Sequence, residues 1–175
     1  MTGLMVATIS LLAMEPAVAV AHRRAMHGWA WGWHRSHHRR PTGAFQANDL
    51  FPVVFAAATV AVMAIGAAVD GLEMLLWMGA GVTAYGALYL VVHDLYIHAR
   101  LGPLPGARSR YLRWVAEAHA IHHLLGREPF GFLVPVVPAA TRARARPAHP
   151  RPPVGPKRPW PYPGAPHPPP TEGSP

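Results

Sequence analysis

The sequence contains no cysteine and few charged residues, and both shortages narrow what the protein can be. Without thiols the chain forms no disulfide, no iron–sulfur cluster and no cysteine-ligated zinc site, so any metal must be held by histidine and carboxylate. Charged residues make up only 14% of the 175 residues, whereas soluble domains average about a quarter. Apolar residues make up 51%. This composition is typical of a membrane protein, and the length suits one domain rather than two.

Three apolar stretches have about the length needed to cross a bilayer, for which roughly twenty helical residues suffice. They cover residues 4–21, 51–69 and 74–92. Glu15 and Pro16 interrupt the first stretch, which ends in Ala-Val-Ala and could therefore be a cleaved signal peptide. However, no Lys or Arg precedes it, and Arg23 and Arg24 follow it directly. That charge pattern favours a retained helix.

The basic residues fall on one side of these expected spans. Five Arg lie in residues 22–50, five in residues 99–128, and the remaining six Lys and Arg lie beyond residue 138. Spans that run out-to-in, in-to-out and out-to-in place all of them in the cytoplasm, as expected for an inner (cytoplasmic) membrane protein. The net charge of +8 is then explained without nucleic acid, for which no recognition motif is present.

Ten of the twelve histidines lie in four short clusters, which the same topology places at the cytoplasmic face. The clusters are HRRAMH (His22 and His27), HRSHH (His34, His37 and His38), HDLYIH (His93 and His98) and HAIHH (His119, His122 and His123). The i, i+3, i+4 spacing of the two triads puts three imidazoles on one helix face and predicts a chelating array. The i, i+5 pairs are turned by about 140° on an α-helix, so they converge only where the helix ends or bends.

The number of histidines predicts two metal ions, because ten nitrogens exceed the roughly four to six ligands that one metal takes. Imidazole suits Zn, Cu, Fe and Ni, and spacing alone does not choose between iron and zinc. Three carboxylates near the clusters are candidates for orienting the imidazole N–H groups: Asp94, Glu117 and Glu15.

The rest of the chain is expected to be short helix and irregular structure. A helix is expected from about Ser109 into HAIHH, and the apolar segment 129–138 is too short to span but could cap the site or lie in the interface. From Ala139 the composition turns to Arg, Pro and Ala, which predicts a disordered tail. We therefore expect an all-α, integral membrane helical bundle in residues 1–138 and a disordered Pro/Arg-rich tail in residues 139–175, whose His149 and His167 are not ligand candidates.

Four segments of the chain closely resemble the bacterial β-carotene hydroxylases. The segments are HRRAMHGWAWGWHRSHH, NDLFPVVFA, GVTAYGALYLVVHDLYIH and AHAIHH…FGFL, and the resemblance runs from about Met14 to Val134. These proteins belong to the fatty acid hydroxylase/sterol desaturase superfamily of membrane non-haem di-iron monooxygenases. The resemblance implies that the ten clustered histidines bind two irons, that O2 is the co-substrate, and that a separate ferredoxin-type protein supplies electrons.

The resemblance also implies the reaction, which is hydroxylation of carbons 3 and 3′ of β-ionone rings. β-Carotene dissolved among the membrane lipids would become β-cryptoxanthin and then zeaxanthin. One alternative is a hydroxylase or desaturase of another membrane lipid, such as a fatty acyl chain or a sterol. A second is a non-catalytic metal carrier, which predicts carboxylates inside the spans. Residues 51–69 and 74–92 contain none.

Overall fold

The computed structural model describes residues 2–39, 45–101 and 109–145, and these residues form helices and no strand. The predicted all-α class is confirmed for this part of the chain. The elements are α1 (Gly3–Ala21), η1 (His22–Trp29), α2 (Trp31–His34), η2 (Ala47–Asp49), α3 (Leu50–Ala68), α4 (Met74–Tyr89), η3 (Leu90–Ile97), α5 (Arg110–Leu125) and α6 (Ala139–Ala145). The segments η1 and η3 are π-helical, and η2 is a short 3₁₀-helix.

Three long helices have the length and apolar composition to cross a membrane, as the sequence predicts. They are α1 with η1 (Gly3–Trp29), η2 with α3 (Ala47–Ala68) and α4 with η3 (Met74–Ile97). Large apolar side chains on them point outward: Leu12 is 68% exposed and Val60 is 66% exposed. Such continuous apolar surface is left for lipid, because a soluble protein would bury it.

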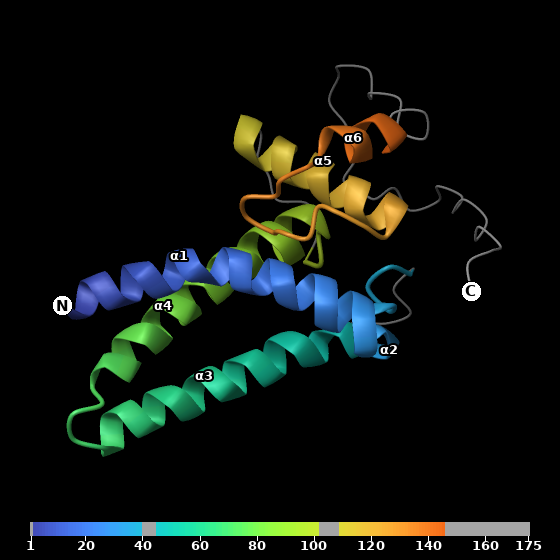
Figure 1. Cartoon of the computed structure of the whole chain (residues 1–175). Coiled ribbons are helices and arrows are strands. Elements are labelled where there is room, and N and C mark those ends of the chain that lie inside the picture. The colour runs from blue at the N-terminus through green and yellow to red at the C-terminus, as the bar shows by residue number, and fades with distance from the viewer. Residues whose placement is uncertain (1, 40–44, 102–108, 146–175) are drawn as a thin grey trace.

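Glycine allows the spans to pack closely. Helix α4 packs against both α1 and α3 (Figure 1). A Cβ on Gly81 of α4 would overlap the carbonyl oxygen of Ala7 in α1. A Cβ on Gly79 would overlap the side chain of Met63 in α3. Close approach of backbones through small residues is the usual way in which membrane helices associate, since lipid provides no hydrophobic drive between them.

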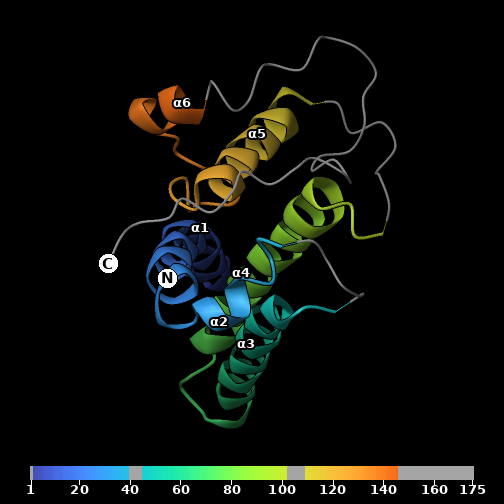
Figure 2. The ribbon, with the colours of Figure 1, turned by 90° about the vertical axis from the view of Figure 1, so that its right-hand side faces the viewer.

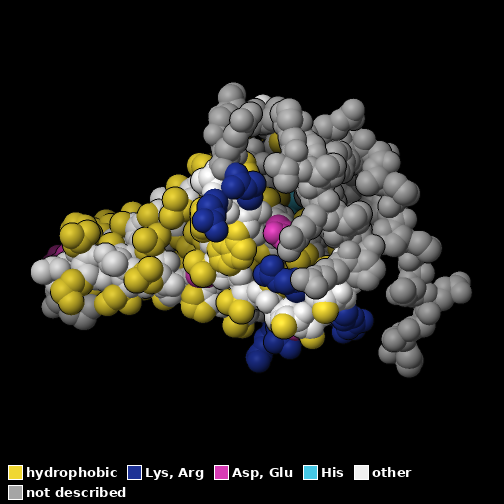
Figure 3. All heavy atoms as spheres, turned by 90° about the horizontal axis from the view of Figure 1, so that it is seen from above, with side chains coloured by type: hydrophobic (Ala, Val, Ile, Leu, Met, Phe, Trp, Pro, Cys, Tyr) yellow, Lys and Arg dark blue, Asp and Glu magenta, His cyan; other side chains and the backbone are white. Residues whose placement is uncertain are grey.

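The two ends of the bundle differ in chemistry. The N-terminus and the turn between α3 and α4 lie at one end, and the elements that carry the histidines lie at the other (Figure 1). In the view of Figure 3, hydrophobic side chains predominate at the first end, and the Arg side chains that it shows lie toward the second. Two of the spans therefore carry their histidines, in η1 and η3, to the same end, next to the arginines.

The helices α5 and α6 form a layer over the histidine end of the spans (Figures 1 and 2). Ser109 caps α5, its hydroxyl accepting a hydrogen bond from the N–H of Leu112, and Gly126 ends the helix in a left-handed conformation. The buried face of α5 packs on η3 through Val115, which contacts Val92 and Ile97. This packing brings the histidines of α5 over those of η3.

The prediction of disorder from Ala139 onward is wrong for its first seven residues. They form α6, which packs on α5 and buries Ala145 to 2% exposure. The sequence AATRARA contains strong helix formers, which supports a helix once α5 offers a surface. The rest of the expected tail, with His149 and His167, lies outside the described residues.

Candidate metal centre

The ten clustered histidines converge into two groups of four with a pair between them. Group one contains His22, His27, His34 and His122, and group two contains His37, His93, His98 and His119; within each group one nitrogen from every residue lies within 4.8 Å of the others. The remaining two, the bridging pair, are His38 and His123, whose rings stack 4.4 Å apart. One member approaches each group: the Nε2 atoms of His38 and His34 are 3.2 Å apart, and those of His123 and His37 are 3.1 Å apart.

Neither triad lies within a single group, so the prediction that each triad forms one array is wrong. In HAIHH, His122 belongs to group one and His119 to group two, because α5 lies across both groups. In HRSHH, α2 ends at His34, and the turns that follow carry His37 into group two. Each group thus collects ligands from both halves of the chain.

The two i, i+5 pairs converge because their helices become π-helical. The ring centroids are 5.0 Å apart for His22 and His27, and 4.6 Å apart for His93 and His98. The N–H of His98 donates to the carbonyl of His93 at 3.0 Å, the five-residue hydrogen bond that defines a π-turn. Five residues then make little more than one turn, and both rings point the same way. The i, i+5 spacing itself was the sequence signal for this feature.

Four imidazoles have their Nδ1 atoms held by groups that only accept hydrogen bonds. The acceptors are the carbonyls of Phe130 and Arg127, the amide oxygen of Asn48 and the carboxylate of Asp94. The Nδ1–H of His22 donates to the carbonyl of Phe130 at 2.9 Å, and that of His122 donates to the carbonyl of Arg127 at 2.7 Å. The Nδ1–H of His34 donates to the amide oxygen of Asn48, and that of His93 to the carboxylate of Asp94, each at 2.7 Å. The proton therefore sits on Nδ1, and the lone pair sits on Nε2, which is how metal-binding histidines are usually oriented.

This arrangement fits a bound cation. The Nε2 atoms of His22 and His34 are 3.0 Å apart, and both carry lone pairs, which repel unless a positive charge lies beside them. Nε2 of His93 is buried and has no hydrogen-bond partner. Nitrogen ligands without sulfur suit iron, copper, nickel or zinc. Both groups therefore have the donor set of a metal site.

Burial keeps the imidazoles beyond the spans in the neutral form that binds metal. Removal from water lowers the pKa values of His34, His37, His119 and His123, and for all of these except His34 neighbouring imidazoles lower them further. Burial lowers the pKa to about 4 for His98 and His122, and to about 2 for His38. These side chains are therefore uncharged at neutral pH.

We expect metal content and stability to fall together as the pH drops below about 6.5, the ordinary pKa of histidine. In the unfolded chain the histidines take up protons from that pH downward, whereas His98 and His122 in the folded chain resist protonation to about pH 4. The unfolded state then binds more protons, so stability decreases with falling pH, and protons also compete with metal. Metal analysis and thermal unfolding of the detergent-solubilised protein at about pH 7.5 and about pH 5 would check this; equal values at both pH would contradict it.

The three carboxylates proposed to orient imidazoles differ in what their side chains contact. Asp94 does so, through His93. Glu117 does not: its side chain is 65% exposed and lies 4.0 Å from Arg142, so that prediction is wrong. Two residues before His119 on α5, it faces the opposite side of the helix. Glu15 hydrogen-bonds to the loop after α5 rather than to an imidazole.

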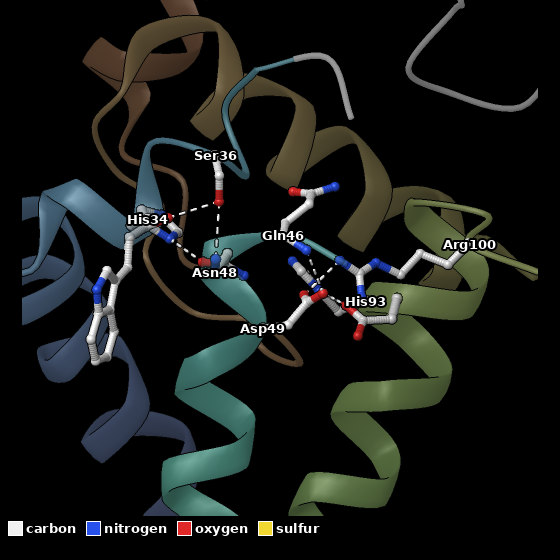
Figure 4. A network of polar contacts seen from close by, with 9 residues as sticks. His34, Ser36, Gln46, Asn48, Asp49, His93 and Arg100 are labelled. Carbon is white, nitrogen blue, oxygen red and sulfur yellow. Dashed lines mark hydrogen bonds and ion pairs between the residues drawn. The ribbon is translucent and has the colours of Figure 1, made fainter. Parts of the chain in front are cut away.

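The segment before the second span contains site residues that sequence reasoning missed. Asn48 is buried, and besides holding His34 it donates its backbone N–H to Ser36 of HRSHH at 3.0 Å (Figure 4). Next to it, Asp49 forms an ion pair with Arg100 at 2.6 Å, which ties the start of α3 to the end of η3 (Figure 4). The sequence feature that could have indicated these site residues is a pair of polar residues directly before an apolar span.

The fold and the site together define an integral membrane protein that binds metal through histidine. The chain belongs to the fatty acid hydroxylase family, whose model matches residues 7–139. It is 44% identical to a β-carotene hydroxylase of Pseudescherichia vulneris over 85% of this chain and 86% of that protein. It is 42% identical to a β-carotene hydroxylase of Pantoea ananas over 81% of this chain and 82% of that protein. No solved structure matches the chain. These relationships identify a hydroxylating oxidoreductase.

Proposed function

We propose that the protein is a β-carotene 3-hydroxylase, which converts β-carotene through β-cryptoxanthin to zeaxanthin. The observation that carries this proposal is the convergence of all four histidine clusters into two ligand groups, in a chain with 44% identity to a β-carotene hydroxylase. Each hydroxylation would consume one O2, two electrons and two protons, and would insert one oxygen atom into a C–H bond and release the other as water. A separate ferredoxin-type protein would supply the electrons.

We assign one iron to each group, with the bridging pair of His38 and His123 between them. Iron held by nitrogen ligands supplies the oxygen-activating redox chemistry that side chains lack. The protein's part is to keep the imidazoles neutral by burial and to aim each Nε2 by holding Nδ1. The ion pair of Asp49 with Arg100 maintains the spacing of the elements that carry the two groups.

Aromatic side chains suit the centre to a hydrocarbon ring. Phe132 stacks on His22 at 4.8 Å between ring centroids and meets the edge of His93 at 5.1 Å. Tyr89 stacks on His93 at 4.5 Å. These side chains form an apolar wall beside both groups, where a β-ionone ring could enter from the bilayer. The arginines at this end support a location at the cytoplasmic face of the inner membrane, where a soluble electron donor would reach the metal centre.

Expression in a β-carotene-producing bacterium, with pigment chromatography and metal analysis, tests the proposal. We expect β-cryptoxanthin and zeaxanthin to replace β-carotene, and about two irons per chain, one for each ligand group. Absence of both products, from membrane-inserted protein that holds iron, would overturn it.

The same experiment separates the other functions. The family's description as fatty acid hydroxylases favours a membrane lipid as the second candidate substrate, and hydroxylated or desaturated acyl chains in the lipid extract would then appear instead. Readily exchangeable zinc without any oxidised product would indicate a metal carrier.

A further inference from the structure

Glu15 is a carboxylate in the middle of the first apolar span, and its contacts lie far away in the sequence. Its oxygens accept hydrogen bonds from the backbone N–H groups of Phe132, Leu133 and Val134 at 2.9, 3.1 and 2.9 Å. The hydroxyl of Tyr85 in α4 donates to it at 2.6 Å. A carboxylate in such surroundings costs free energy unless donors surround it, and these four donors do. The contacts tie α1 to α4 and to the loop between α5 and α6.

The segment held by Glu15, residues 129–135 (the FGFL loop), contains no helix or strand. Its N–H groups therefore need acceptors from elsewhere, and the side chain of Glu15 supplies them for three consecutive residues. The loop also passes very close to the carboxylate: a Cβ added to Gly131 would lie 2.7 Å from Oε1 of Glu15. Real Cβ atoms do not approach so closely, so a methyl group at this position would push the carboxylate of Glu15 aside.

The same loop makes direct contact with the metal centre. The carbonyl of Phe130 accepts the Nδ1–H of His22 at 2.9 Å, and the ring of Phe132 lies nearly parallel to His22, with an interplanar angle of 10°. Phe132 is 5% exposed and also meets Tyr89 edge-on at 4.9 Å. The loop thus orients a ligand of group one and forms the apolar wall beside both groups.

We propose that Glu15 is a positioning residue for this centre: by holding the FGFL loop it sets the orientation of His22 and the shape of the wall that the substrate ring contacts. Glu15 and His22 lie on one continuous helix, so the loop is attached to the same rigid element at two points. The part that concerns the substrate rests on the proposed carotenoid hydroxylation. The part that concerns His22 does not.

Glu15→Gln tests the proposal, because it keeps the shape of the side chain but replaces one acceptor oxygen with an N–H₂ group that faces backbone donors. We expect amide hydrogen exchange in residues 132–134 to accelerate about tenfold, since hydrogen bonds to a charged acceptor are lost, while α4 and α5 keep their protection. We expect metal affinity at group one to fall about tenfold and group two to retain its metal. Glu117→Gln, the same change at an exposed carboxylate, is the matched control and should alter neither.

A second variant disturbs the contact between Glu15 and the FGFL loop by a change in the loop. Gly131→Ala places a methyl group against Glu15 without changing α1, so it should give the same loop exchange and the same loss at group one, even if Glu15→Gln fails to insert. In the pigment assay both variants should raise KM for the carotenoid more than they lower kcat. Unchanged loop exchange and metal content in the variants would overturn the proposal. Lack of zeaxanthin from the wild-type protein would refute the carotenoid function alone, because exchange and metal content are measured without substrate.

Discussion

Alanine at His34 or at His119 is expected to abolish hydroxylation and to reduce the metal content from about two ions per chain to about one. His34 belongs to group one and His119 to group two, so each variant removes a nitrogen from a different group. Both residues are buried, and water cannot readily replace the lost imidazole. Because the proposed reaction uses both metals, we expect either change to lower zeaxanthin formation by at least about 100-fold, above the range seen when only the partners of ligands are removed.

The measurement is metal analysis of purified protein together with pigment chromatography. His149→Ala is the matched control, since that histidine lies outside all four clusters. Retention of two metals and of activity in either variant would show that the group does not bind metal as assigned. Loss of both metals from one variant would mean that the two groups form a single cooperative site.

Removal of the acceptors that hold Nδ1 is expected to weaken each metal separately. Asp94→Ala frees His93 of group two, and Asn48→Ala frees His34 of group one. Partners of this kind typically contribute 10–100-fold to metal affinity, because they set the tautomer and orientation of the ring. The Asp94 variant should lie at the upper end of that range, because a carboxylate also strengthens the imidazole as a ligand.

Chelator competition, followed by metal analysis, would measure the two effects. Asp94→Asn and Asn48→Asp keep an acceptor oxygen and should be milder than the alanine variants. Asp70→Asn, at the exposed turn on the far end of the bundle, should have no effect. Equal weakening of both metals by either alanine variant would contradict the assignment of one acceptor to each group.

Part of the fold follows from local pattern alone. Long apolar runs predict the three long helices, and the structure extends each of them toward the histidine end. The composition after Ala139 predicted disorder where the structure has α6, because this helix forms only where α5 provides a packing surface. Propensity and composition describe a segment by itself, whereas burial depends on what lies against it.

The sequence by itself determined that this is a membrane protein with histidine clusters suited to metal, because it has long apolar runs, ten clustered imidazoles and no thiol. Only the tertiary structure shows which histidines lie together in each group. Spacing relates residues on one helix, but each group is assembled from three segments whose relative rotation is set by packing. The division of both triads, the roles of Asn48 and Glu15, and the exposure of Glu117 all arise from contacts between distant segments. Local periodicity contains no information on such contacts.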